Sequence, residues 1–67
     1  MPAPTLRFLQ VRFGRGEITA GYAASILWLA AEESHRTRGT APPPPAADIC
    51  AGILLHWPHL IQKGFHQ

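Results

Sequence analysis

The central stretch of the chain, residues 19–38, has the sequence TAGYAASILWLAAEESHRTR. On a helix, with about 100° between successive residues, its apolar positions and the neighbouring Ile18 fall mainly on two opposite sides. One side carries Ile18, Tyr22, Ile26 and Leu29, and the other carries Ala20, Ala24, Leu27 and Ala31. A helix that is apolar on two sides must be covered from more than one direction. The stretch therefore predicts a helix with at least two packing partners.

The composition predicts a small folded protein with part of its surface covered by a partner. The 67 residues are 46% apolar and 15% charged, which is too apolar for a disordered chain and low in charge for the surface of a small monomer. The single cysteine, Cys50, excludes an internal disulfide. No apolar run approaches the ~20 residues that a membrane-spanning helix needs, and the N-terminus lacks a signal-peptide pattern, so we expect a cytoplasmic location.

The residues before the central helix predict a short strand. Residues 6–13, LRFLQVRF, are rich in Leu, Val and Phe, so we expect a strand or an extended arm there, after a flexible leader at residues 1–5. Glycines on either side of Arg15 predict a turn before the helix, whose expected range is 17–38. A lone strand needs a partner for its backbone hydrogen bonds. The chain offers no second strand, so we expect the same strand of a second copy to pair with it.

The residues after the central helix predict a return helix. Four consecutive prolines lie within residues 40–45 and favour a stiff, extended spacer. A second helix is expected over residues 46–63, with a kink or break at Pro58 because proline lacks the N–H that a helix needs. The expected fold class is therefore mainly α: a short N-terminal strand or arm, then two antiparallel helices joined by a proline-rich loop, assembled as a homodimer.

No residue pattern in the chain predicts a catalytic centre or a cofactor site. Cys50 shares a helical side with apolar residues, which favours a packing role over thiol catalysis. His56 and His59 are three residues apart and could bind a metal ion together with Cys50, His35 or His66. Their spacing matches no compact zinc motif and a proline lies between them, so we expect no metal and no cofactor. We expect a protein that is not an enzyme.

The excess of apolar residues and the low charge favour a small regulatory protein that binds another protein and modulates or inhibits it. Small inhibitors encoded by viruses or mobile elements have a similar size and composition. Trp, Tyr and Arg are the usual anchors of protein interfaces. The expected contact residues are therefore exposed aromatic and cationic side chains, namely Tyr22, Trp28, Arg36, Arg38 and Trp57.

A DNA-binding regulator is the alternative function. The order strand, helix, helix is also that of ribbon-helix-helix dimers, whose paired strands enter the major groove. The predicted strand and turn carry Arg7, Arg12 and Arg15, which could contact nucleic acid. The net charge of +2 allows this function but does not require it.

Overall fold

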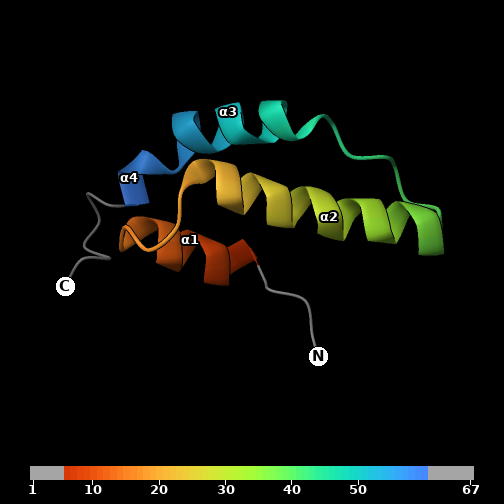
Figure 1. The fold of residues 1–67 in the computed structure, drawn as a ribbon, viewed down its shortest axis with the longest axis horizontal. Coiled ribbons are helices and arrows are strands. Elements are labelled where there is room, and N and C mark those ends of the chain that lie inside the picture. Colours follow the sequence, from red (N-terminus) through yellow and green to blue (C-terminus); the bar gives the residue numbers. More distant parts are fainter. Residues whose placement is uncertain (1–5, 61–67) are drawn as a thin grey trace.

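A computed structural model describes residues 6–60 of the chain. The predicted leader at residues 1–5 and the end of the second predicted helix, residues 61–63, lie outside the described residues. The described part consists of three helices and one final helical turn (Figure 1). These elements are α1 (Leu6–Gly14), α2 (Ala20–Arg38), α3 (Ala46–His56) and the turn α4 (Pro58–Leu60). The mainly helical fold class predicted from the sequence is confirmed.

The strand or arm predicted over residues 6–13 is wrong, because these residues form most of α1. Leu9 is buried and Phe13, four residues later, is partly buried against the same core. A spacing of four places both side chains on one side of a helix, whereas a strand of this sequence would have mixed both of its faces. A helix also satisfies its backbone hydrogen bonds internally, so no pairing strand is needed. No strand occurs between residues 6 and 60.

Local signals at both ends define α2. The Thr19 side chain caps the first turn, and its Oγ1 accepts a hydrogen bond of 3.0 Å from the backbone N–H of Tyr22. This cap starts the helix three residues later than the predicted range of 17–38. At the other end Gly39 adopts φ 74°, a left-handed conformation that favours glycine, and its N–H donates to the carbonyl of His35 at 3.1 Å.

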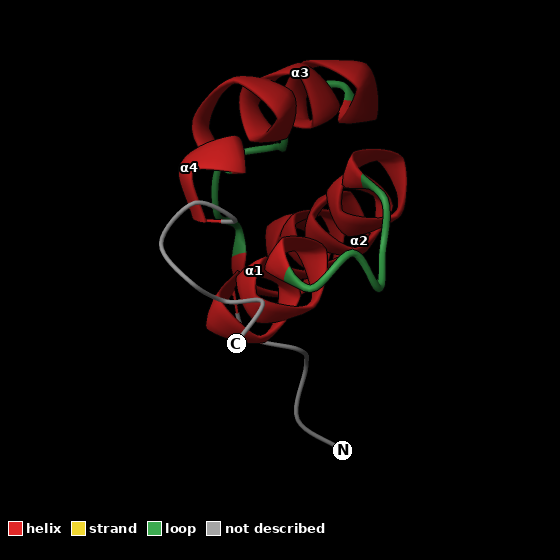
Figure 2. Cartoon of the chain, turned by 90° about the vertical axis from the view of Figure 1, so that its left-hand side faces the viewer, coloured by secondary structure: helices red, strands yellow, loops and turns green. Residues whose placement is uncertain are grey.

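The core lies where α2 meets its two neighbours. Figure 1 shows α1 along one side of the first part of α2 and α3 along another side, and Figure 2 shows the three helices from one end. Small side chains on α2 let both neighbours approach closely. Phe13 contacts Trp57 edge to face, with ring centroids 5.6 Å apart. The buried side chains of the core are Leu9, Ala20, Ala23, Ala24, Ile53 and Trp57.

The C-terminal half continues from the proline segment into α3. The segment between α2 and α3 has no regular secondary structure, and α3 returns alongside α2 (Figure 1). The helix ends at His56, and Pro58 begins the separate turn α4. The N–H of Trp57 still donates to the carbonyl of Ile53 at 2.9 Å, but Pro58 has no N–H to continue this pattern. None of the helices between residues 6 and 60 is both long and apolar enough to cross a membrane.

Candidate protein-binding surfaces

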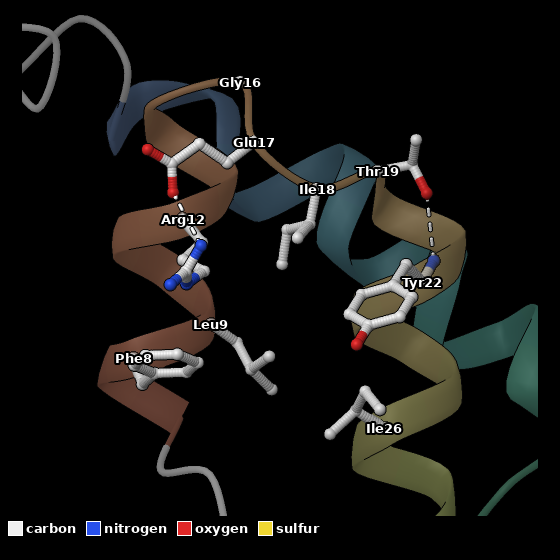
Figure 3. Close-up of a pocket in the computed structure, with 9 residues that line it drawn as sticks. All are labelled: Phe8, Leu9, Arg12, Gly16, Glu17, Ile18, Thr19, Tyr22 and Ile26. Carbon is white, nitrogen blue, oxygen red and sulfur yellow. Dashed lines mark hydrogen bonds and ion pairs between the residues drawn. The ribbon is translucent and has the colours of Figure 1, made fainter.

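A groove of about 630 Å³ lies between α1 and the first half of α2 (Figure 3). The loop that joins the two helices closes one end of it. Apolar side chains from both helices and from the loop face one another across it, and polar groups lie at its closed end. The lining residues are Phe8, Leu9, Arg12, Gly16, Glu17, Ile18, Thr19, Tyr22 and Ile26.

Apolar side chains line the groove from its base to its rim. Leu9 lies at the base and is buried, while Ile18 and Ile26 are partly buried beside it. Phe8 on α1 and Tyr22 on α2 form the two lips and are exposed. Exposed aromatic side chains above an apolar floor are typical of a surface that binds another apolar surface.

The closed end of the groove carries one ion pair and no net charge. Arg12 Nη1 donates to Glu17 Oε1 at 3.0 Å, and both side chains are exposed. The guanidinium carbon of Arg12 also lies 4.9 Å from the centre of the Phe8 ring, a cation–π contact. An exposed pair of this kind contributes about 1 kcal/mol or less, so it is easily rearranged by a partner.

The apolar surface of the groove continues along α2. Tyr22, Ile26 and Leu29 are spaced i, i+4 and i+7 and share one side of the helix, and we name them the α2 stripe. Leu29 is exposed although it is a large apolar residue. Beyond Leu29 a second ion pair joins Arg36 Nη2 to Glu33 Oε1 at 2.7 Å. The stripe is thus bounded by an ion pair at each end.

The outer face of α3 is a second exposed apolar surface, made by Ala47, Ala51, Leu54 and Leu55. Leu54 and Leu55 are 60% and 75% exposed, and their positions follow Ala47 by seven and eight residues, which is the spacing of one helical side. The core takes other residues from this part of the chain, notably Ile53. The outer face therefore has no packing role within the described part of the chain.

The predicted contact residues do not form one surface. Tyr22, Arg36 and Arg38 are exposed, and Trp28 is half-buried roughly 120° around α2 from Tyr22. The expectation that Trp57 is exposed is wrong, because only 8% of it is accessible and it packs in the core. The predicted contact residues leave out five exposed large apolar residues of the described part: Leu6, Phe8, Leu29, Leu54 and Leu55. The signal for the last two was available, because α3 is apolar on its outer side as well as its inner one.

The predicted nucleic-acid contacts lie on a helix instead of a strand. Arg7 and Arg12 are part of α1, and Arg15 follows in the turn. A ribbon-helix-helix arrangement needs strands that enter the major groove, and residues 6–13 form a helix, so no strand carries these arginines. Arg12 is engaged by Glu17 and Phe8.

The histidines and Cys50 are not gathered into a metal site. Among residues 6–60 no three His, Cys, Asp or Glu side chains lie close enough together to hold a metal ion. Cys50 is half-buried against the core. The Nδ1 atom of His35 lies 2.6 Å from the carbonyl oxygen of Thr40, which ties the end of α2 to the proline segment. His66 lies outside the described residues.

The functional conclusion is based on two exposed apolar surfaces, the groove with the α2 stripe and the outer face of α3. No protein family, curated protein or solved structure matches this chain.

Proposed function

We propose that this chain is a small, non-enzymatic regulatory protein that acts by binding another protein through the outer face of α3. The observation that carries the proposal is the exposure of Leu54 and Leu55, at 60% and 75%, on a helix whose inner side already supplies the core. Adjacent large apolar side chains that the fold does not use are typical of interaction sites. Full burial of such a side chain stabilises a complex by about 1.5–3 kcal/mol before the costs of association.

The spacing of the outer face suggests how a target would bind. Ala47, Ala51 and Leu54 follow the i, i+4, i+7 pattern of a helix that lies in a hydrophobic groove of its partner. In this proposal the antiparallel pair of α2 and α3, joined by the proline segment, holds the outer face in a fixed orientation. A surface that is ordered before binding loses less entropy when the complex forms. The target would therefore present an apolar groove about the width of one helix.

The test is affinity capture from a lysate of the native host, with and without nuclease. The bait is the full chain, a Leu54→Ser/Leu55→Ser variant, and an Ala30→Ser control that alters an exposed position on α2. We expect a target protein that survives nuclease, is retained by the control and is lost at least about tenfold by the double variant. Circular dichroism of each bait shows whether it is folded. Equal capture by the wild type and the double variant refutes the proposed surface.

A DNA-binding regulator is the second candidate, favoured by three arginines at α1 and its turn. Residues 6–16 contain Arg7, Arg12 and Arg15 and no acidic residue. If all three contact phosphates of duplex DNA, the logarithm of the binding constant falls with the logarithm of salt concentration with a slope of about −2.7. A gel-shift series at several salt concentrations measures this slope. Absence of binding at low salt removes this candidate, and loss of the captured target on nuclease treatment favours it.

A further inference from the structure

We propose that a second copy of this chain covers the α2 stripe and the groove beside it, with the two α2 helices antiparallel. Length gives the first reason. At 1.5 Å per residue α1, with nine residues, spans roughly 13 Å, whereas α2, with 19 residues, spans roughly 28 Å. The chain's own α1 therefore covers one side of α2 only along its first part. The lips of the groove and Leu29 stay exposed.

The charges at the two ends of the stripe identify the partner as a second copy. One end carries the Arg12–Glu17 pair and the other carries the Glu33–Arg36 pair. When two α2 helices pack antiparallel with Ile26 opposite Ile26, position 33 of one copy lies opposite position 19 of the other, and position 36 lies opposite position 16. Glu33 of the second copy then approaches Arg12, and Arg36 of the second copy approaches Glu17. In a symmetric dimer each of these two contacts between opposite charges occurs twice, once at each end of the paired helices.

The apolar part of the surface is also suited to a copy of itself. The stripe has no charged side chain among Tyr22, Ile26 and Leu29, so two copies meet there without repulsion. The antiparallel arrangement places Leu29 of one copy near Tyr22 of the other, with Phe8 at the edge of the contact. A contact made by one helix and the lips of one groove buries less surface area than a standard protein interface, below about 1,200 Å² in total. We therefore expect a dimer that dissociates in the micromolar range.

This dimer does not depend on the proposed target or on the outer face of α3. Exchanging the charges at positions 12 and 33 distinguishes contacts between two copies from contacts within one chain. Arg12→Glu and Glu33→Arg each place like charges across the dimer contact, and each also breaks an ion pair within the chain. The double variant restores the pair between copies, whereas both pairs within each chain stay broken. Within one chain the two ends are about 20 Å apart along α2, so rescue by the double variant can arise only between chains.

The assay is sedimentation equilibrium of the full chain from about 10 µM to about 1 mM. We expect a monomer–dimer equilibrium for the wild type, a dissociation constant raised about tenfold by each single charge reversal, and recovery to within about threefold in the double variant. Leu29→Ser weakens the dimer by a similar factor, and the matched Leu54→Ser on α3 leaves it unchanged. A wild type that is monomeric throughout overturns the inference. So does a dimer that only the α3 variant disrupts, or one that both single reversals leave intact.

Discussion

Replacement of Leu9 by alanine tests whether α1 is packed onto the rest of the chain. Leu9 is the most buried of the large side chains in the described core, with 2% of its surface accessible. It joins α1 to the alanines of α2 and to Ile53 of α3 in one cluster. Leu6, on the same helix, is 53% exposed and provides a control with the same chemical change.

The magnitude follows from burial. The change Leu→Ala removes three carbon atoms, worth about 0.8 kcal/mol each when fully buried, so Leu9→Ala loses about 2.4 kcal/mol before any cavity remains. A cavity raises the loss to about 3–4 kcal/mol, while collapse of the small core around the site keeps it near the lower value. The same change at Leu6, which is about half as buried, loses about 1 kcal/mol. The whole chain is expected to have only roughly 3–10 kcal/mol of stability, so the larger loss is easily measured.

Urea unfolding followed by circular dichroism measures both losses. Linear extrapolation gives the free energy of unfolding of the wild type and of each variant. The expected difference between Leu9→Ala and Leu6→Ala is at least about 1.4 kcal/mol, which corresponds to a tenfold change in the unfolding equilibrium constant. If the two losses agree within about 0.5 kcal/mol, α1 is not packed through Leu9, and the groove between α1 and α2 does not exist as described.

Three further changes test local features of the fold. Thr19→Ala removes the cap of α2 and is expected to lower the free energy of unfolding by about 1 kcal/mol. Thr19→Ser retains the capping hydroxyl and is expected to leave this free energy nearly unchanged, and urea unfolding measures both values. Gly39→Ala places a side chain at φ 74° and is expected to lower the melting temperature by about 4–8 °C. Gly52 lies within a helix with open space around it, so Gly52→Ala is expected to raise the melting temperature. Arg12→Gln breaks the exposed pair with Glu17 and is expected to lose less than about 1 kcal/mol at low salt and almost nothing at about 1 M salt. A loss for Arg12→Gln that does not depend on salt contradicts a purely electrostatic role.

The misassigned strand shows why short apolar segments are difficult to assign from sequence. Residues 6–13 contain Leu, Val and Phe in an order that fits neither period cleanly. The side chains that pack on the core, Leu9 and the partly buried Phe13, are four residues apart, but the segment also places Leu6 and Phe8 on its exposed side. The choice between helix and strand depends on which of these residues find a partner. That partner is α2, which the local sequence does not contain.

The same error affected the reasoning about a second copy. The sequence predicts that residues 6–13 pair with another chain and that the central helix needs at least two packing partners. Because α1 is a helix that packs on α2, the chain provides part of this cover itself. The apolar side formed by Tyr22, Ile26 and Leu29 is left partly open, so a second copy now has a shorter surface to cover. The proposed dimer contact is accordingly between α2 helices instead of strands.

What the sequence alone determined is local. Thr19 and Gly39 delimit α2, because a side-chain cap and a left-handed glycine act within one helical turn of their position. The predicted range of 17–38 has the correct end of this helix and starts three residues early. Pro58 separates α4 from α3 because a missing N–H is a property of that residue wherever it lies. The two apolar sides of residues 19–38 likewise predicted a long helix with more than one packing partner.

Only the tertiary structure decided which apolar side chains are covered. Trp57 and Leu55 are both large apolar residues near the end of α3, yet Trp57 is buried against Phe13 from α1 whereas Leu55 is exposed. The difference depends on a helix more than 40 positions earlier in the chain. Burial is a property of contacts between elements distant in sequence, and the periodicity of a single element identifies its apolar sides without showing which side finds a neighbour.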